Sequence, residues 1–308
     1  MVNDGKDDIS IYKIETKQKI DKKKVLLVIL ILLSIICIML IWRNINNTMI
    51  SYKVYKKYEN QILSLNNQEL EKKQQKEAEA EKRRQDKLPK LTEIGKQNIE
   101  KIYKSEQKRA FLTFDDGPSS LTQQILDTLK QENVKATFFV LGTKVAQNPE
   151  IVKRIYDEGH YIANHGYSHV YSQIYSTPEN VLNEYNQCNE EIKKALGEPE
   201  YNSHLFRFPG GLAGGKYAQI KEQAGEILKQ NNIAYVDWNA LNGDAERNNL
   251  TPEFEISRLN ETTENKNSIV VLMHDSPAKK VTADILQQII QNLREKGYEF
   301  KNFYEIIK

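Results

Sequence analysis

Hydrophobic and polar positions divide the chain into three stretches of different character. Residues 25–42 are a run of apolar side chains in which only Ser34 is clearly polar. Residues 52–88 are dominated by charged and amide side chains, and from residue 109 onward short apolar runs alternate with amphipathic stretches. The pattern predicts an apolar helix, then a polar helical spacer, then a folded domain.

The apolar run is long enough to cross a membrane. As a helix, residues 25–42 would extend about 27 Å, close to the thickness of the hydrocarbon core of a bilayer. Basic residues tend to stay on the cytoplasmic side, and only Arg43 closely follows the run. We therefore predict a single-pass protein of the cell membrane, with residues 1–24 in the cytoplasm, a transmembrane helix over residues 25–42 and the remainder outside the cell. The basic residues that precede the run are Lys17, Lys19, Lys22, Lys23 and Lys24.

Residues 43–108 are expected to form an extracellular stalk and a linker. A loose apolar spacing over residues 54–70 predicts a weak coiled coil and self-association through the stalk. Residues 71–86 have no apolar stripe, which is typical of a solvated helix or a semi-rigid spacer. Pro89 should end this helix, and residues 90–108 are interpreted as the linker.

The third stretch, residues 109–308, has the pattern of an α/β domain. Amphipathic stretches over residues 121–129, 181–192, 217–227 and 285–293 lie between the strand-like runs, with Ser119 or Ser120 and Thr177 placed to cap two of them. Repeated strand and helix units favour a parallel sheet, and their number suggests a distorted or incomplete (β/α) barrel. The strands are expected over residues 109–114, 136–141, 161–164, 205–208, 233–238, 268–274 and 298–301.

The composition limits the classes of partner and the residue types that could bind a metal. The formal net charge is only +2, so the overall charge gives no reason to expect nucleic acid as a partner. The chain has two cysteines, Cys37 and Cys188, and the first lies in the apolar run. A metal in the folded domain would therefore be bound by histidine and carboxylate side chains.

Chemically reactive side chains follow the predicted strands repeatedly. Asp115 and Asp116 follow the first strand, and neighbouring residues leaving a strand point to opposite sides, so one could hold a metal while the other moves a proton. Two histidines four residues apart, with one aspartate, can make a metal site that leaves coordination positions open. The side chains at the later strand ends are His165, His169, Arg207, Asp244 and His274, whereas His160 and His204 are interpreted as structural or surface residues.

These motifs together resemble a known family. Thr-Phe-Asp-Asp-Gly-Pro at 113–118, His-x-x-x-His at 165–169, Arg-x-Pro at 207–209, Asp244 and Leu-x-His at 272–274 are similar, in this order, to the motifs of polysaccharide deacetylases of the NodB-homology class, carbohydrate esterase family 4. The resemblance covers residues 109–308. The membrane helix with an external domain resembles the peptidoglycan N-acetylglucosamine deacetylases of Gram-positive bacteria. The resemblance implies a distorted (β/α) barrel and hydrolysis of N-acetyl groups on cell-wall glycan.

The resemblance also implies a divalent metal and its ligands. Asp116, His165 and His169 would bind the metal, most often zinc, with cobalt, nickel or manganese as alternatives. Asp115 would be the general base for the attacking water. Arg207 would pair with Asp115 and keep it ionised and oriented.

Further roles follow from the same resemblance. A backbone N–H near Gly210, after Pro209, would stabilise the oxyanion together with the metal. Leu272 would line the pocket for the acetyl methyl group. His274 would protonate the departing amine, and the negative charge of Asp244 would make it more basic.

Three positions depart from the family pattern and leave the substrate open. Gly166 replaces a serine or threonine, Gly210 replaces a common tyrosine, which would open one wall of the groove, and Ala245 replaces a tryptophan for which Trp238 could compensate. One alternative is therefore deacetylation of N-acetylmuramic acid or of another N- or O-acetylated polysaccharide. An alternative of another class is a catalytically dead, membrane-tethered glycan-binding protein, which the retained acid, base and ligand residues argue against.

Overall fold

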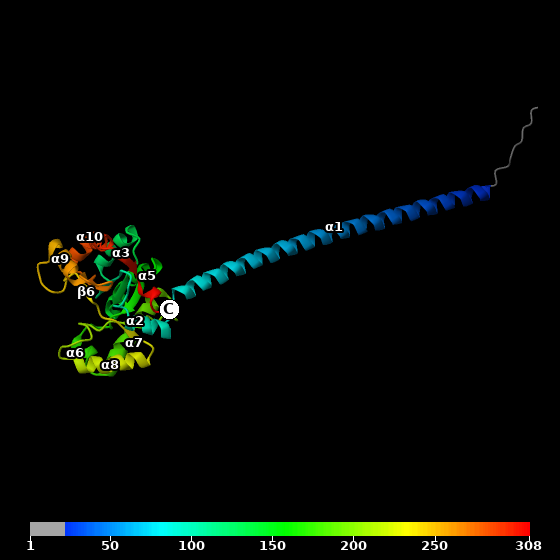
Figure 1. Ribbon diagram of the computed structural model, residues 1–308. Coiled ribbons are helices and arrows are strands. Elements are labelled where there is room, and N and C mark those ends of the chain that lie inside the picture. The colour runs from blue at the N-terminus through cyan, green and yellow to red at the C-terminus, as the bar shows by residue number, and fades with distance from the viewer. Residues whose placement is uncertain (1–21) are drawn as a thin grey trace, which may run out of the picture. The chain divides into compact units, whose positions relative to one another are not determined.

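The computed structural model describes residues 22–308, so residues 1–21 of the predicted cytoplasmic tail lie outside the described residues. The chain divides into two compact units, with the boundary between Ala80 and Glu81. The first unit consists of most of helix α1 (Lys22–Lys87), drawn in Figure 1 as one long helix. Residues 22–87 contain neither glycine nor proline, and Pro89 follows the end of the helix.

Helix α1 contains the apolar run that was expected to cross a membrane. By length and composition it is the single described helix that is able to do so. Its side chains from residue 22 to residue 83 are exposed in the structure, including the apolar ones of the stalk such as Val54, Ile62 and Leu65. The structure therefore gives no support to a coiled coil, and self-association of the stalk stays a prediction.

Residues 90–108 are not the linker that the sequence suggested. They include helix α2 (Glu93–Glu100), and Leu91, Ile99 and Ile102 are buried in the second unit. The backbone N–H of Thr92 donates to the carbonyl of Ile307 at 3.0 Å, which joins this segment to the C-terminus. The folded unit therefore begins near Glu81 and not at residue 109, because these apolar side chains fill one end of its interior.

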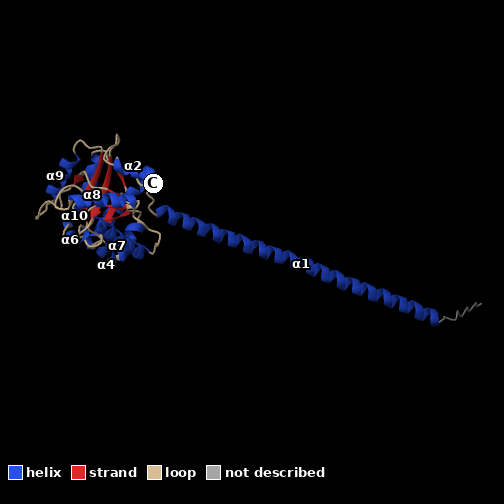
Figure 2. Cartoon of the chain, turned by 90° about the horizontal axis from the view of Figure 1, so that it is seen from below, coloured by secondary structure: helices blue, strands red, loops and turns tan. Residues whose placement is uncertain are grey.

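The second unit is built on a parallel sheet, with helices around the strands in Figure 2. The strand order is β5-β4-β3-β2-β1-β7-β6, with β8 paired to β1, and every pairing is parallel. Among the described residues, β5 and β6 are the two ends of this order, so the barrel is incomplete, as predicted. The strands are β1 (Arg109–Asp115), β2 (Thr137–Val140), β3 (Tyr161–Asn164), β4 (Leu205–Phe206), β5 (Ala234–Tyr235), β6 (Ala240–Leu241), β7 (Ser268–His274) and β8 (Glu299–Lys301).

The four predicted amphipathic helices are present, and further helices lie between them. Ser119 caps α3 by accepting the N–H of Leu121, and Thr177 caps α7 by accepting the N–H of Asn180. The bounds are α3 (Ser120–Gln131), α4 (Gly142–Gln147), α5 (Pro149–Asp157), α6 (Tyr171–Ile174), α7 (Pro178–Leu196), α8 (Ala218–Gln230), α9 (Pro252–Thr263), α10 (Lys280–Glu295) and the 3-10 turn η1 (Phe303–Glu305).

Alternation along the strands separates an inner face of the sheet from an outer face. Ala110, Leu112 and Phe114 of β1 pack in the cluster under the outer helices, whereas Phe111 packs in a second cluster with Phe303. Since side chains alternate along a strand, Thr113 and Asp115 share the inner face with Phe111. Side chains alternate in the same way in β7, β3 and β4. The reactive residues at the ends of all four strands therefore lie on the inner face of the sheet.

Candidate active site

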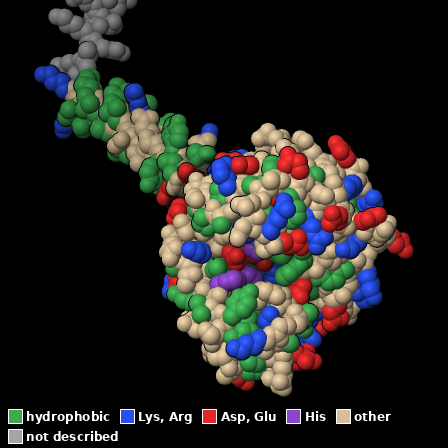
Figure 3. All heavy atoms as spheres, turned by 90° about the vertical axis from the view of Figure 1, so that its left-hand side faces the viewer, with side chains coloured by type: hydrophobic (Ala, Val, Ile, Leu, Met, Phe, Trp, Pro, Cys, Tyr) green, Lys and Arg blue, Asp and Glu red, His purple; other side chains and the backbone are tan. Residues whose placement is uncertain are grey.

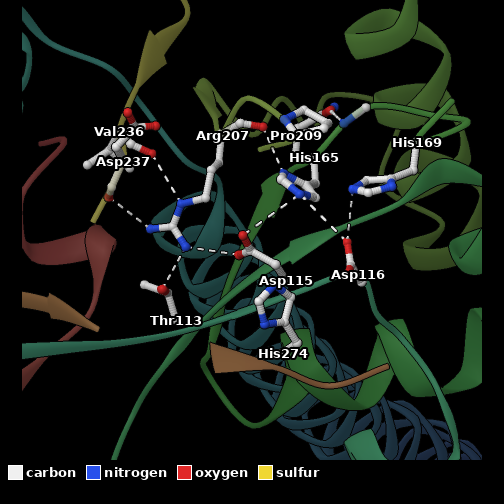
Figure 4. A network of polar contacts seen from close by, with 12 residues as sticks. Thr113, Asp115, Asp116, His165, His169, Arg207, Pro209, Val236, Asp237 and His274 are labelled. Atoms are coloured by element: carbon white, nitrogen blue, oxygen red, sulfur yellow. Dashed lines mark hydrogen bonds and ion pairs between the residues drawn. The ribbon is translucent and has the colours of Figure 1, made fainter. Parts of the chain in front are cut away.

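Asp115 and Asp116 lie side by side and both lie near His165, but Asp115 also pairs with Arg207 and Asp116 with His169 (Figure 4). Asp115 is the last residue of β1 and is buried on the inner face of the sheet. Asp116 has a φ of 74°, in the left-handed region that non-glycine residues adopt at a cost of about 1–2 kcal/mol. This turn of the backbone breaks the strand alternation and directs the Asp116 carboxylate to two histidines.

Asp116, His165 and His169 form the predicted ligand set. Their ligand atoms lie within 4.8 Å of one another. Asp116 Oδ1 is 3.7 Å from Nε2 of His165 and 3.3 Å from Nε2 of His169. His169 has a φ of 58°, so two of the three candidate ligands depend on left-handed backbone. The structure therefore brings together the three side chains that the sequence predicted.

The tautomer of His165 is set by its neighbour Arg207. Nδ1 of His165 lies 2.8 Å from the carbonyl oxygen of Arg207, which can only accept, so Nδ1 carries the proton and Nε2 has a free lone pair. Burial lowers the pKa of His165 to about 3, which keeps the ring neutral. A neutral imidazole with a free Nε2 is the form that binds a metal.

The donor set fits a divalent metal. Oδ1 of Asp116 is buried and has no hydrogen-bond partner among the described residues, although it points between two imidazole nitrogens. A buried carboxylate oxygen without a partner is costly unless a cation or donor satisfies it. Two imidazoles and one carboxylate suit zinc and similar divalent metals, and they leave coordination positions open.

Arg207 holds the other carboxylate. Its Nη1 donates to Asp115 Oδ1 at 2.9 Å and to the hydroxyl of Thr113 at 2.7 Å, while its remaining donors reach the carbonyls of Val236 and Asp237. The guanidinium also lies 4.0 Å from the ring centroid of Phe139 and is fully buried. Burial raises the pKa of Asp115 above the usual value for an aspartate, and the charge of Arg207 opposes that rise.

His274 and Asp244 form a second pair across the site from the histidine ligands. Nδ1 of His274 lies 2.7 Å from Oδ1 of Asp244, and the backbone N–H of His274 donates to Oδ2 at 2.8 Å. Burial alone would lower the pKa of His274, but the hydrogen bond and charge of Asp244, with Asp115 and Asp116 further away, raise it to about 9. His274 is therefore protonated at neutral pH, with Nε2 left for a substrate.

The remaining predicted residues flank these groups. Pro209 is buried and its carbonyl accepts from the hydroxyl of Tyr175, whereas Gly210 is exposed with a φ of 73°. Leu272 is buried in β7 on the same face as His274. Figure 3 shows histidine and acidic side chains gathered in a hollow of one face of the unit, with hydrophobic side chains beside them.

Comparisons with known proteins agree with this arrangement. Residues 103–227 match the polysaccharide deacetylase family. A peptidoglycan-N-acetylglucosamine deacetylase of Bacillus cereus is 32% identical over 216 residues, which cover 69% of this chain and 76% of that protein. The chain belongs to the polysaccharide deacetylase family.

Two further relatives support the family assignment. The peptidoglycan-N-acetylglucosamine deacetylase PgdA of Listeria monocytogenes is 37% identical over 65% of this chain, which corresponds to 39% of that longer protein. A carbohydrate esterase family 4 esterase of Streptococcus mutans superposes with a TM-score of 0.62 at 32% identity, covering 67% of this chain and 90% of the solved one. This chain is therefore a hydrolase of the polysaccharide deacetylase family, which is generally dependent on a divalent metal.

The structure explains two of the three positions at which this polysaccharide deacetylase departs from the family pattern, Gly166 and Gly210, and offers no explanation for Ala245. Gly166 has a φ of 88°, and a Cβ there would lie 3.0 Å from Ile174, so a larger residue would be strained. The wall beside Gly210 is not open, because Tyr171 occupies that space. Trp238 lies against Gly211 and against the guanidinium of Arg207, and Ala245 is exposed.

Glu184 of α7 was missed by the sequence analysis. It is buried, and one carboxylate oxygen accepts the backbone N–H groups of Tyr167 and Ser168 at 2.7 Å while the other accepts the hydroxyl of Ser168. These residues lie between the two histidine ligands. The signal in the sequence was a single glutamate on the apolar face of an amphipathic helix.

Removing the Glu184 carboxylate is expected to weaken metal binding without removing a ligand. We expect Glu184→Ala to lower zinc affinity by about 10–100-fold, because the loop that carries His165 and His169 loses three hydrogen bonds. Competition with a chromophoric chelator measures the affinity. Glu190→Ala, at an exposed position on the same helix, is the matched control and should bind zinc like the wild type.

A buried polar network behind Asp244 was also missed. The hydroxyl of Thr282 lies 3.2 Å from Asp244 and 2.9 Å from Glu255, and the amide of Asn242 donates to both Glu255 and Thr282. Burial raises the pKa of Glu255 to about 7. These residues come from a loop and two helices far apart in sequence, so no local sequence pattern predicts the network. They hold the Asp244 carboxylate in place beneath His274.

Proposed function

We propose that this protein is a metal-dependent deacetylase that removes acetyl groups from N-acetylglucosamine in peptidoglycan. The observation that carries the proposal is that two adjacent aspartates have different neighbours. Asp115 is held by buried Arg207, and Asp116 faces two histidines. The relatives named as peptidoglycan-N-acetylglucosamine deacetylases support the choice of substrate.

Asp116, His165 and His169 are the residues that would hold the metal. When bound, a divalent cation would polarise the acetyl carbonyl and make a water more acidic. Because Asp116 Oδ1 and the Nε2 atoms of both histidines already converge, the chain needs little rearrangement to accept the ion. Zinc suits this donor set best.

The other residues move protons around the amide. Asp115 takes a proton from the attacking water, and Arg207 keeps its carboxylate oriented toward the site. The backbone N–H of Gly210 stabilises the negative charge that develops on the carbonyl oxygen. Protonated His274 then donates its Nε2 proton to the nitrogen of the breaking C–N bond, so acetate and a free amine leave. Leu272 is placed to contact the acetyl methyl group.

The long helix fits a role at the cell surface. We propose that residues 25–42 of α1 cross the membrane and that the lysines before them stay in the cytoplasm. The following part of α1, up to Lys87, would then separate the catalytic unit from the membrane. This arrangement would place a deacetylase next to the glycan strands of the wall.

Acetate release from defined glycans tests the proposal. The full-length chain in detergent, loaded with zinc, should release acetate from N-acetylglucosamine oligomers and from purified peptidoglycan. Mass spectrometry of digested product would show glucosamine if the proposal is right, and deacetylated muramic acid if the alternative substrate is right. No release from either material with zinc, cobalt, nickel or manganese would reject the enzyme in favour of a glycan-binding protein.

The pH dependence of this reaction should depend on Asp244. Since His274 must be protonated to act as an acid and its pKa is raised to about 9, activity should fall as the pH rises through about 9. Asp244→Asn removes the charge that favours protonated His274, so the alkaline limb should move to lower pH by about one to two units. A profile of kcat/KM against pH, which reports the pKa values of the free enzyme, measures the shift, and an unchanged alkaline limb would contradict the role of this pair.

A further inference from the structure

Large exposed apolar side chains are few on the folded unit, and two of them lie next to the candidate site. Among residues 81–308, the large apolar residues that are exposed are Ile94, Tyr103, Val170 and Tyr171. Two of these four directly follow the candidate ligand His169. Figure 3 likewise shows hydrophobic side chains bordering the histidines in the hollow. An exposed apolar patch beside a reactive site indicates a surface that binds something.

Tyr171 is held in one position by its neighbours. Its ring centroid lies 5.6 Å from that of His169 and 5.7 Å from that of Tyr175, in edge-to-face arrangements. Tyr175 is itself buried and donates its hydroxyl to the carbonyl of Pro209 at 2.7 Å. The Tyr171 ring is therefore supported from behind while 39% of the residue surface remains exposed.

Gly210 and Tyr171 are complementary. A Cβ on Gly210 would lie 2.6 Å from the hydroxyl oxygen of Tyr171, so the ring can take its position only because residue 210 has no side chain. The backbone of Gly210 also has a φ of 73°, which glycine adopts without strain. The Tyr171 ring thus extends from the candidate metal ligand His169 to Gly210, the residue whose backbone N–H would stabilise the oxyanion.

We propose that Tyr171 is a sugar-binding platform, on which the pyranose next to the acetylated sugar lays its apolar face. The proposal rests on the function proposed above and adds a residue that selects polymeric over single-sugar substrates. A pyranose has a face of C–H groups and a rim of hydroxyl groups, and a rigid aromatic ring with a polar hydroxyl at one end matches both. Because the ring is already held in place, little conformational entropy is lost on binding.

Kinetics of the full-length chain on substrates of two lengths test the platform. Tyr171→Ala should raise KM for an N-acetylglucosamine tetramer about five- to tenfold, with kcat and zinc affinity within about twofold of the wild type. The values of kcat/KM for monomeric N-acetylglucosamine should change less than about twofold, since one sugar does not reach the platform. Tyr171→Phe keeps the ring but loses the hydroxyl, so it should raise KM for the tetramer less than Tyr171→Ala does. Ile94→Ala removes an exposed apolar side chain of α2 and is the control that should leave KM unchanged.

The outcomes separate the platform from the proposed function. An unchanged KM for the tetramer in Tyr171→Ala rejects the platform while the deacetylase stands. Loss of zinc affinity in that variant, or equal losses on monomer and tetramer, would mean that Tyr171 only supports His169, which also rejects it. If the wild type releases no acetate, the deacetylase fails, and calorimetric titration with the tetramer decides the platform. In that case, weaker binding of the tetramer by Tyr171→Ala than by the wild type supports the platform. Equal binding by the two proteins, or no binding by either, rejects the platform.

Discussion

Replacing Asp115 by asparagine is expected to lower kcat for acetate release by about 10²–10⁴-fold while the chain still binds zinc. The amide cannot take a proton from water, but it has nearly the size of the carboxylate. Its oxygen can still accept from Nη1 of Arg207, which lies 2.9 Å from Asp115 Oδ1. The ligand atoms of Asp116, His165 and His169 are left in place. The result would separate the base from the metal ligand beside it.

The measurements are kcat on N-acetylglucosamine oligomers and zinc content after dialysis. The Asp115→Asn substitution would leave the buried Arg207 guanidinium without its counter-charge, so thermal unfolding should be recorded as well. Asp127→Asn removes an exposed carboxylate that pairs with Arg154 and is the matched control. A rate close to that of the wild type in Asp115→Asn would show that Asp115 is not the base.

Much of the fold and the site could be predicted because strand alternation and strand ends are local properties. The strands 161–164 and 268–274 were predicted with their observed bounds, and β1 was one residue longer than expected. In a parallel sheet, the carboxyl ends of strands meet at one edge, so residues that follow separate strands converge. His165, Arg207 and His274 are brought together in this way.

Contacts between distant segments could not be predicted from local patterns. Strand β6 has only two residues, Ala240 and Leu241, and pairs with β7 alone. Helix α2 lies in a stretch that is mostly polar, and its burial depends on contacts of Ile99 and Ile102 with the C-terminal segment. Both elements therefore depend on contacts with segments elsewhere in the sequence, which no local pattern contains.

The predicted effect of Arg207 on Asp115 was incomplete for a similar reason. The sequence suggested an ion pair that keeps Asp115 ionised, and the pair is present at 2.9 Å. However, the depth of burial decides the direction in which the pKa of Asp115 moves, and burial raises it. A raised pKa suits a general base, because the carboxylate then accepts a proton more readily. Only the packing of the inner face around Asp115 reveals this balance.

Removing a ligand should have the largest effect of all, because metal and activity should be lost together. Asp116→Ala is expected to lower zinc affinity by more than about 100-fold and acetate release by about 10³-fold or more, since polarisation by a metal contributes several kcal/mol to catalysis. Folding should be retained. Asp116 Oδ1 has no hydrogen-bond partner among the described residues, so no hydrogen bond of that oxygen is lost. Alanine tolerates a φ of 74° less well than aspartate does, so a small loss of thermal stability is expected.

The control for Asp116→Ala is a substitution of a histidine that the structure places outside the site. The two variants are compared in zinc content and in activity. The side chain of His204 donates one hydrogen bond, from Nδ1 to the carbonyl of Asn232 at 2.9 Å, and the residue has a φ of 51° that asparagine tolerates. His204→Asn should therefore keep zinc and activity near wild-type values. If Asp116→Ala retained stoichiometric zinc after dialysis, the convergence of Asp116, His165 and His169 would not be the metal site. The carboxylate of Asp115, 3.8 Å from Nε2 of His165, would then be the ligand to examine.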